Sequence, residues 1–463
     1  MVANSNNKEV VMNYNEIRPF KNPHLIETKV EEDFFFITNP CISDGFKIIN
    51  INQYAILKKI DGQRTITDIA NLTNYTETDI KQVCDILSEK EIVNYTNTFR
   101  KPEKSNSVKS LALWVHTTNN CCLRCSYCYI STLGQNDYLS EENIKIFCNK
   151  LIQSAKTNSL NEISLRLSGG EPLLKFDLWK PYLVSLKQDL KDFGCELQLA
   201  FLTNAVLFTD EIIDFVRENS IGIGVSMDGL SEYQDNTRHF KDGTGSFSIV
   251  SKNVLRLKEK KCNPNIMTVV SNKNLDGLID FTQYIIENSL RCRFSLVKKE
   301  EINIMKTIDI LTRCYELFDK AIDNGYNFSK RHNFGDLKFG TPSIQTCSNA
   351  INAAALYSDG SIYFCHRLFG DDTPQGTIFE DNDLVEIFRR KTYYFEYNPD
   401  CQKCPYFYIC MGGCPLNRIN NKDAHCEIYK AVIPQYLTLL GKERLRNIRK
   451  IIITKTNERR CKK

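Results

Sequence analysis

Three cysteines in one short segment constrain this chain more than any other feature. Cys121, Cys125 and Cys128 lie in the run NNCCLRCSYCYI, with C-x3-C-x2-C spacing. Three thiolates so close together can ligate three irons of a [4Fe–4S] cluster, which normally takes four cysteines. The fourth iron then lacks a protein ligand and can bind a second molecule. The apolar run 111–118 before this segment predicts a β-strand, so the cysteines would follow the carboxyl end of a strand.

Two plainer interpretations compete with a cluster: a structural zinc loop, or a chance grouping in a chain with 19 cysteines. Zinc sites favour two C-x2-C pairs or mixed Cys/His sets, so the spacing favours the cluster. Cys122 is out of register with the other three, and we predict that it is a bystander.

The cysteine spacing resembles that of the radical S-adenosylmethionine (SAM) superfamily. The resemblance implies that the open iron chelates the amino and carboxylate groups of SAM. Reductive cleavage of SAM then gives a 5′-deoxyadenosyl radical, which takes a hydrogen atom from the substrate. Tyr127, the aromatic residue before the third cysteine, would lie near the adenine.

The chain from about residue 110 alternates strand-like and helical runs. Expected strands cover 111–118, 162–168, 196–203, 221–227, 265–270 and 291–296, and the clearest helix covers 140–157. This alternation predicts an α/β fold with a parallel sheet and right-handed crossovers. About six such units resemble the partial (β/α)6 barrel of the radical SAM family, which is open on one side.

The motif SGGEP follows the second expected strand, roughly 40 residues after the cysteine segment. It resembles the GGEP motif of the family. Gly169 and Gly170 would let the backbone approach closely, and Glu171 would accept a hydrogen bond from the ammonium of SAM. A tight turn before a helix is the plainer interpretation of this motif taken alone.

Three later motifs resemble family positions around SAM. Asn204, in Thr-Asn-Ala, would face SAM; Ser226 and Asp228, in Ser-Met-Asp-Gly, would contact ribose; Arg238 would lie near the SAM carboxylate. Many relatives have His-Asp before that arginine, whereas this chain has Gln234 followed by an aspartate, so we assign Gln234 no role. Because Asn and Asp are ordinary turn residues at strand ends, the joint order of the motifs carries the argument.

A second cysteine pattern occupies the last third of the chain. Its seven cysteines resemble the SPASM domain, an auxiliary-cluster extension of radical SAM peptide maturases, and a zinc ribbon would explain only four of them. In the family, one [4Fe–4S] cluster is held by the equivalents of Cys401, Cys404, Cys410 and Cys426, and another by those of Cys347, Cys365 and Cys414. The resemblance therefore implies three [4Fe–4S] clusters in all.

The set with Cys347 lacks a fourth cysteine nearby, because residues 341–346 contain none. Cys292 and Cys314 are predicted to pack inside the barrel. A substrate thiolate could occupy the open iron; a distant cysteine or a non-cysteine ligand is an equal alternative. His366 would be a donor near the cluster, a proton carrier or a solvated side chain. Sulfatase-maturating relatives usually have an acidic residue there, which disfavours that reaction.

Residues 24–105 form a small module of two expected strands (34–37 and 45–51), three helices (53–60, 65–72 and 77–90) and a last strand (91–95). This order resembles a winged helix-turn-helix. Residues 1–105 contain 13 Lys and Arg against 15 Asp and Glu, so the charge is −2 and DNA binding is disfavoured. The alternative is a recognition element for the leader of a precursor peptide, which would add a strand to the sheet edge and pack against the third helix. A purely packing module is a third interpretation.

The expected organisation is a flexible lead-in (1–23), the winged-helix-like module (24–105) with a linker at 100–108, the radical SAM barrel (106–330) and the SPASM domain (331–463), with a closing helix at 427–452. Composition is that of a globular protein, with 42% hydrophobic and 25% charged residues. A net charge of +4 is too small to favour nucleic acid or membrane as a partner. Tight cysteine sets, the lack of a signal peptide and the lack of a spanning apolar run predict a cytoplasmic protein.

These features predict a radical SAM/SPASM enzyme that modifies a ribosomally made precursor peptide, with SAM as cofactor and a flavodoxin- or ferredoxin-type reductant. A thioether between cysteine sulfur and carbon, as in sactipeptides and ranthipeptides, is the first choice because of the open cluster position. The auxiliary clusters would take the electron left over when the bond closes. Carbon–carbon cross-linking, epimerisation and sulfatase-type formylglycine formation are alternatives on the same machinery, and an iron–sulfur DNA-binding regulator is the alternative outside enzymes. No motif identifies a catalytic side chain.

Overall fold

A mostly parallel sheet of ten strands forms the centre of this computed structural model, which describes residues 13–103, 107–133, 137–390 and 396–461. The six predicted strands are present as neighbours in the sheet: β6 (Ser110–His116), β8 (Glu162–Ser168), β9 (Glu196–Thr203), β10 (Gly222–Ser226), β12 (Asn265–Val270) and β13 (Arg291–Leu296). All their pairings are parallel. The predicted α/β alternation is therefore confirmed.

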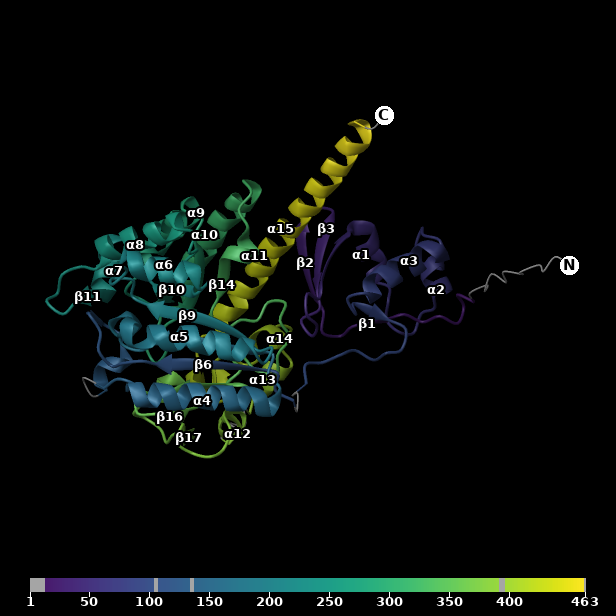
Figure 1. Cartoon of the computed structure of the whole chain (residues 1–463). Helices are drawn as coiled ribbons and strands as arrows, with labels where there is room; N and C mark the ends of the chain where they lie inside the picture. The colour runs from purple at the N-terminus through teal and green to yellow at the C-terminus, as the bar shows by residue number, and fades with distance from the viewer. Residues whose placement is uncertain (1–12, 104–106, 134–136, 391–395, 462–463) are drawn as a thin grey trace.

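Helices follow the strands and bury one face of the sheet (Figure 1). On β8, Ile163, Leu165 and Leu167 are at most 1% exposed, and they belong to the same core as Trp179. The helices of this layer are α4 (Glu141–Asn158), α5 (Phe176–Lys191), α6 (Asp210–Glu218), α7 (Ser231–Thr237), α8 (Phe247–Glu259), α9 (Leu278–Glu287) and α10 (Ile304–Asp323), with 3-10 turns at Pro172–Lys175 and Leu275–Gly277.

The central sheet continues past the boundary predicted at residue 330. At one end β14 (His332–Phe334) pairs with β13, and at the other β15 (Ala353–Leu356) pairs in parallel with β6. Strands β16 (Ser361–Tyr363) and β17 (Gly376–Thr377) then extend the sheet antiparallel. The last third of the chain thus shares backbone hydrogen bonds with the barrel. Its other elements are short: α11 (Phe328–Arg331), α12 (Leu384–Arg389), α13 (Pro399–Gln402), α14 (Phe407–Cys410), β18 (Arg418–Ile419), β19 (Lys422–Asp423), and 3-10 turns at His366–Leu368 and Pro415–Asn417.

The N-terminal module is a three-stranded antiparallel sheet followed by three helices. The strands are β2 (Ile26–Glu31), β3 (Phe34–Thr38) and β4 (Phe46–Asn50), and the helices are α1 (Ile51–Leu57), α2 (Ile66–Asn71) and α3 (Glu77–Ser88). The sequence prediction missed β2. The predicted lead-in is also too long, because β1 (Phe20–Lys21) pairs with β5 (Val93–Asn94) and the half-buried Ile17 packs against the module core. Part of that lead-in (residues 1–12) and part of the linker (104–106) lie outside the described residues.

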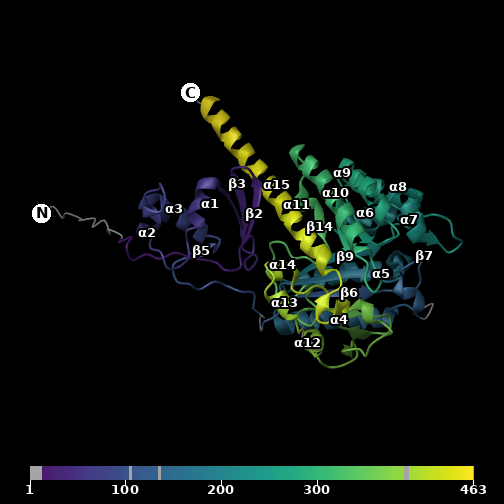
Figure 2. The same ribbon diagram turned by 180° about the vertical axis from the view of Figure 1, so that it is seen from behind.

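A 36-residue helix, α15 (Cys426–Cys461), joins the N-terminal module to the barrel. Figures 1 and 2 show it passing beside α10 and α11 and then along β2 and β3, with its end projecting beyond them. Phe36 and Val30 belong to the same hydrophobic core as Tyr436 and Leu440 of this helix. The closing helix predicted to end at 452 is therefore longer, and it carries a contact that periodicity did not reveal. None of the described helices is long and apolar enough to cross a bilayer.

Gly441 of α15 is the point of closest approach to the module. A Cβ added there would lie 2.5 Å from a methyl group of Val30 and 2.8 Å from Cβ of Phe36. We expect Gly441→Leu to push the module off the helix while leaving the barrel folded, because a Cβ such as that of Phe36 cannot move aside without its backbone. Limited proteolysis should then cut the segment 100–108 at least several-fold faster. Lys450→Leu, at an exposed position of the same helix, is the control and should not change the rate.

Candidate active site

The three cysteines of the first motif lie on the loop that follows β6, as predicted. Part of this loop forms β7 (Leu123–Cys125), which pairs antiparallel with β11 (Arg238–Phe240), so that Arg238 stands opposite Cys125. Cys128 precedes a 3-10 turn (Tyr129–Thr132), and its N–H donates to the carbonyl of Cys125 at 3.1 Å. The short β7–β11 ladder therefore brings Arg238, which is 113 positions from Cys125 in the sequence, to the cysteine loop.

Hydrogen-bond donors surround the sulfur atoms of this loop. Cys121 Sγ accepts from the N–H of Leu123 at 3.4 Å and from the Asn204 amide at 3.6 Å. Cys125 Sγ accepts from Arg238 Nη1 at 3.6 Å. Burial raises the pKa of Cys125 to about 12 and also raises the pKa of Cys128. These thiols are therefore neutral until a metal displaces their protons.

The donor set is of the kind that a [4Fe–4S] cluster uses. Among the described residues, no three His, Cys, Asp or Glu side chains converge closely enough to hold one metal ion. A [4Fe–4S] cluster binds each cysteine through a separate iron, and N–H groups aimed at the sulfurs favour the thiolate form. Cys121, Cys125 and Cys128 thus have the residue type, spacing and donors that such a cluster needs.

Cys122 lies at this site rather than away from it. The Asn204 amide donates to Cys122 Sγ at 3.3 Å, a shorter distance than to Cys121. The predicted bystander role stays a prediction, and the contact provides a direct test of it. We expect Cys122→Ser to keep the iron content and the visible absorption of the reconstituted protein, since the hydroxyl can still accept from Asn204. Loss of about four irons per chain would show instead that Cys122 is a ligand of the cluster.

The two glycines after β8 are needed by the cysteine loop itself. Gly170 N–H donates to the Thr118 carbonyl at 2.6 Å, and a Cβ on Gly170 would lie 2.2 Å from the Asn120 carbonyl oxygen. Gly169 has φ +142°, a backbone conformation that side chains disfavour. The glycines therefore pack the strand end against residues 118–120, and closeness to SAM stays a prediction.

Glu171 is fully buried and ties two strand ends together. Its carboxylate accepts from Thr203 Oγ1 at 2.6 Å, from the N–H of Leu173 at 3.1 Å and from the N–H of Asn204 at 2.8 Å. Burial raises the pKa of Glu171 to about 7. The side chain thus fixes the loop after β9, so that Asn204 reaches the cysteine sulfurs; an ammonium contact stays a prediction.

Asp228 forms contacts that the sequence did not predict. It has no exposed surface, and its Oδ2 pairs with Arg238 Nε at 2.7 Å and accepts a short hydrogen bond from Tyr127 OH. Its Oδ1 accepts from the N–H of Val269 at 3.0 Å. The carboxylate therefore orients Arg238 and Tyr127, and the ribose contact stays a prediction. Ser226, half-buried at the end of β10, stays an untested candidate.

The Tyr127–Asp228–Arg238 group is electrostatically coupled. Burial alone would lower the pKa of Arg238, but the attraction of Asp228 raises it well above its usual range. Burial raises the pKa of Tyr127, so its phenol stays a hydrogen-bond donor. The guanidinium also lies 5.2 Å from the centre of the Tyr127 ring, and the three side chains form one rigid unit beside Cys125.

Two residues at this site escaped the sequence analysis. Gln234, to which no role was assigned, accepts from the N–H of Asp228 at 2.8 Å and donates to Ser246 Oγ at 3.2 Å. Asn274 donates to the carbonyls of Asp228 at 2.7 Å and Val269 at 2.9 Å. The position of Gln234, where relatives carry histidine, was a signal that a hydrogen-bonding side chain is required; Asn274 lies in no motif.

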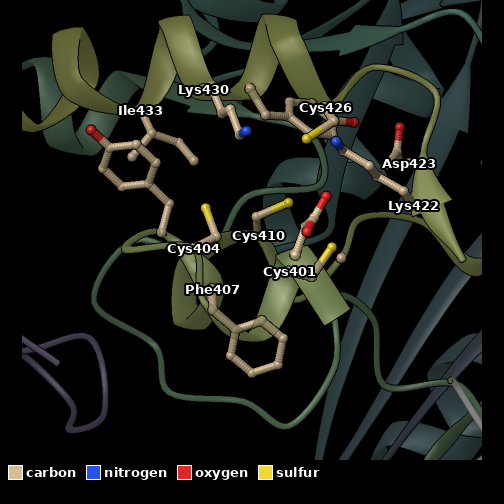
Figure 3. Close-up of a pocket in the computed structure, with 13 residues that line it drawn as sticks. Cys401, Cys404, Phe407, Cys410, Lys422, Asp423, Cys426, Lys430 and Ile433 are labelled. Atoms are coloured by element: carbon tan, nitrogen blue, oxygen red, sulfur yellow. The ribbon is translucent and has the colours of Figure 1, made fainter. Parts of the chain in front are cut away.

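Four C-terminal cysteines line one cavity. In Figure 3 the sulfur atoms of Cys401, Cys404, Cys410 and Cys426 point toward a common space, which is also lined by Lys422, Lys430 and Phe407. Burial and the neighbouring Asp423 raise the pKa of Cys410, as do the other three cysteines. The structure therefore brings together the four residues predicted for one auxiliary cluster.

The remaining three cysteines lie together elsewhere in the last third. Burial raises the pKa of Cys365 to about 11 and the pKa of Cys414 to about 12. The charge of Cys347 also raises the pKa of both thiols. Cys292 and Cys314 are 1% exposed and pack in the barrel core, as predicted.

His366 is half-buried against two aromatic side chains. Its ring stacks on Trp114 with centroids 4.0 Å apart, and its Nδ1 lies 2.7 Å from Tyr129 OH. Burial lowers the pKa of His366 to about 3. Pairing of β15 with β6 places the segment after Cys365 over Trp114, which no sequence pattern revealed.

Comparison with known proteins identifies the family of the barrel. The family model "Radical SAM superfamily" matches residues 115–285. The Methanocaldococcus jannaschii protein MJ0907 is 33% identical over 57% of this chain and 87% of its own length. A cysteine-type anaerobic sulfatase-maturating enzyme of Clostridium perfringens is 24% identical (68% of this chain, 92% of that protein). The radical SAM cyclopropyl synthase TigE of Paramaledivibacter caminithermalis is 21% identical over 91% of this chain and 96% of its own length.

Solved structures share the fold. The structure of anSMEcpe with bound AdoMet and the Cp18Cys peptide aligns with TM-score 0.58 at 21% identity, over 71% of this chain and 98% of that one. Streptococcus suis SuiB bound to the precursor peptide SuiA aligns with TM-score 0.51 at 15% identity, over 88% and 99%. The second alignment extends beyond the barrel. These matches agree with the cysteine loop and with the strand-end residues around it. The chain therefore belongs to the radical SAM superfamily.

Proposed function

We propose that this chain is a radical SAM peptide maturase of the SPASM type, which modifies a ribosomally made precursor peptide. The observation that carries the proposal is the meeting of Cys121, Cys125 and Cys128 with the Asn204 and Arg238 donors at the carboxyl ends of the parallel strands. A [4Fe–4S] cluster with SAM bound there would supply the 5′-deoxyadenosyl radical.

The residues of this chain hold and orient the reactants. The three cysteines would hold the cluster, and Tyr127 would lie beside the adenine. Arg238, fixed by Asp228, would present a cation to the carboxylate of SAM. Asn204 and the Gly169–Glu171 turn would close the loops around the amino group. Because the Asp228–Arg238 pair is buried, its charge is little screened by solvent.

The last third adds two auxiliary [4Fe–4S] clusters, which makes three in all. The four cysteines in Figure 3 support one of them, and the set of Cys347, Cys365 and Cys414 supports the other. A flavodoxin- or ferredoxin-type protein is the proposed reductant. We place the protein in the cytoplasm, where a reducing milieu preserves free thiol sets.

The N-terminal module supports a peptide as substrate. In the described chain its sheet has the order β2-β3-β4, so β2 and β4 are edge strands that can accept another strand. SuiB binds a precursor peptide in its solved structure, and anSMEcpe binds a peptide in its own. A leader peptide added to the module edge beside α3 is the proposed mode. The net charge of −2 over residues 1–105, from 13 basic and 15 acidic residues, argues against a DNA-binding regulator.

A thioether is the first choice of product. Residues 341–346, directly before Cys347, contain no cysteine, and a substrate thiolate would complete that cluster. Carbon–carbon bond formation is the second candidate, because TigE, named a cyclopropyl synthase, matches 91% of this chain. Epimerisation and formylglycine formation remain alternatives on the same machinery.

Mass spectrometry of a precursor peptide encoded near the gene tests the proposal, after anaerobic reaction with reconstituted enzyme, SAM and reductant. Loss of two hydrogens together with resistance of one cysteine to alkylation would establish a thioether. Loss of two hydrogens with every cysteine still alkylated would indicate a carbon–carbon bond. An unchanged mass in ordinary water, with one deuterium gained in heavy water, would point to epimerisation. No change under any condition would refute peptide modification.

A further inference from the structure

The cysteine loop has an outer face that the proposed chemistry does not use. Along β7, Leu123 is 3% exposed, whereas the side chain of Arg124 is exposed. The sulfur of Cys125 lies on the inner side, where it accepts from Arg238. Because successive strand residues point to opposite faces, Arg124 and the exposed Ser126 lie on the side away from that sulfur. The loop therefore has one face for the proposed cluster and another face for solvent.

Lys273 adds a second cation to this outer face. It follows β12 and is 147 positions from Ser126 in the sequence, yet its Nζ donates to Ser126 Oγ at 3.0 Å. The side chain of Lys273 is exposed, like that of Arg124. One cation therefore belongs to the residue before Cys125, and the other is hydrogen-bonded to the residue after it.

The turn after β11 provides a third cation. His239 of β11 stands opposite Arg124 in the ladder, and the exposed Lys241 follows two residues later. A Cβ added to Gly243 in this turn would meet nothing within 4 Å. Asp242, the acidic residue of the turn, accepts hydrogen bonds from within it. The turn thus extends the cationic face into open solvent.

These cations are available to a partner. Within the described part of the chain, Arg124, Lys241 and Lys273 form no ion pair. Asp276, three residues after Lys273, pairs instead with Lys306 at 2.7 Å. Exposed charges of one sign on one face raise the rate at which an oppositely charged protein arrives, and complementary charge also orients that protein. The outer face therefore favours an acidic protein.

The position of the ladder leaves room for such a partner. Figures 1 and 2 show the molecule from opposite sides, and in both views β11 or β7 lies at the end of the barrel away from the N-terminal module. Helix α15 projects beside the module, at the other end of the molecule. A protein bound at the ladder can therefore be present at the same time as a peptide bound at the module.

We propose that the outer face of the β7–β11 ladder, with Arg124, Lys241 and Lys273, docks a small acidic electron carrier of the flavodoxin type. This inference rests on the proposed function, since it takes the loop to hold the cluster that cleaves SAM. Only the strand β7 separates the docked carrier from Cys125. The carrier's anionic flavin hydroquinone gives up one electron and becomes the neutral semiquinone, and the cluster gains that electron. No bond forms or breaks and no proton moves.

The test compares two reductants of the anaerobic, reconstituted full-length protein with SAM. One is a photoreduced bacterial flavodoxin, and the other is dithionite, a small ion that needs no docking surface. The measured quantity is the initial rate of 5′-deoxyadenosine formation at low ionic strength. In Arg124→Gln/Lys273→Gln, we expect the rate with flavodoxin to fall at least tenfold and the rate with dithionite to stay the same. Lys258→Gln/Lys260→Gln, which removes two exposed charges at the end of α8, is the matched control and should retain both rates.

Binding provides a measurement without turnover. Calorimetric titration of the protein with oxidised flavodoxin should give an affinity that falls steeply as salt is added, because the attraction between exposed charges is screened. The double variant should bind at least tenfold more weakly than the unchanged protein at low salt, and the two affinities should converge at high salt.

An unchanged rate with flavodoxin in Arg124→Gln/Lys273→Gln would overturn the proposal and place electron entry at another face, such as the cavity of the four C-terminal cysteines. Cleavage of SAM by the unchanged protein with dithionite but not with flavodoxin would overturn it as well. Equal losses with both reductants would mean that the double change damages the loop. Lys241→Glu, outside the loop, then decides: it should lower only the rate with flavodoxin, at least threefold, and an unchanged rate refutes the docking face.

Failure of the proposed function gives a different result. If the unchanged protein cleaves no SAM with either reductant, the proposed reaction is refuted, and salt-dependent binding of flavodoxin still tests the docking face. If dithionite supports cleavage and the charge changes affect neither flavodoxin binding nor the rate with flavodoxin, only the docking face is refuted.

Discussion

Cys125→Ala should abolish SAM cleavage, with formation of 5′-deoxyadenosine falling at least about a thousandfold. The thiolate would be one of only three protein ligands to the proposed cluster, and its loss leaves two, too few to retain it. The same change removes the acceptor of Arg238 Nη1. Anaerobic reconstitution followed by iron analysis, and chromatography of the products formed from SAM, would measure both effects.

The matched control is Cys195→Ala. Cys195 is a buried cysteine, 2% exposed, directly before β9 and outside every motif. It should leave SAM cleavage and iron content unchanged and cost only a modest amount of stability, through the small cavity left behind. Full SAM cleavage by Cys125→Ala would refute the cluster at this loop, whether or not the auxiliary clusters are retained.

Asp228→Asn should be among the most destabilising single substitutions in the barrel. Arg238 and Asp228 are 10% and 0% exposed, and their ion pair is 2.7 Å long. Removing one charge leaves the guanidinium buried without a counter-ion, which costs about 3–5 kcal/mol of the free energy of unfolding. Tyr127 also loses its charged acceptor, so SAM binding should weaken at least tenfold. Denaturant titration and equilibrium binding of SAM would measure the two effects.

Asp214→Asn provides the comparison for this prediction. The ion pair of Asp214 with Arg217 is 2.9 Å long, but each of the two side chains is 42% exposed. Exposed ion pairs contribute little to the free energy of unfolding. Asp214→Asn should therefore have the same free energy of unfolding as the unchanged protein. A second comparison, Asp228→Asn/Arg238→Gln, should recover part of the lost stability because no unpaired charge remains. A loss below about 1 kcal/mol for Asp228→Asn alone would contradict the assigned burial of this pair.

Much of the fold was predictable because local patterns agreed with one another. Strands such as 162–168 and 196–203 have alternating or continuous apolar residues and end in motifs, and their observed bounds match the prediction. Helix α4 was predicted from Ser140 and its acidic first turn, and Ser140 Oγ does accept from the N–H of Asn143. These signals depend on residues within a few positions of each other, which is the range that a sequence pattern reports.

Long-range pairings were not predictable in the same way. The pairing of β15 with β6, the packing of Gly441 against Phe36 and the stacking of His366 on Trp114 join residues far apart in the chain. No periodicity encodes them, because each depends on where a separate element docks. The β15–β6 pairing, for example, joins residues on both sides of the expected boundary at 331.

The sequence by itself determined the chemistry that can be assembled: the spacing of the cysteines, the order of the strand-end motifs and the parallel α/β class. Only the tertiary structure decided which partner each polar side chain has. It paired Asp228 with Arg238, and it brought the Gln234 side chain to the N–H of Asp228. The physical reason is that covalent spacing fixes which residues lie near each other along the chain, whereas burial and charge pairing are satisfied only after the sheet and helices have packed.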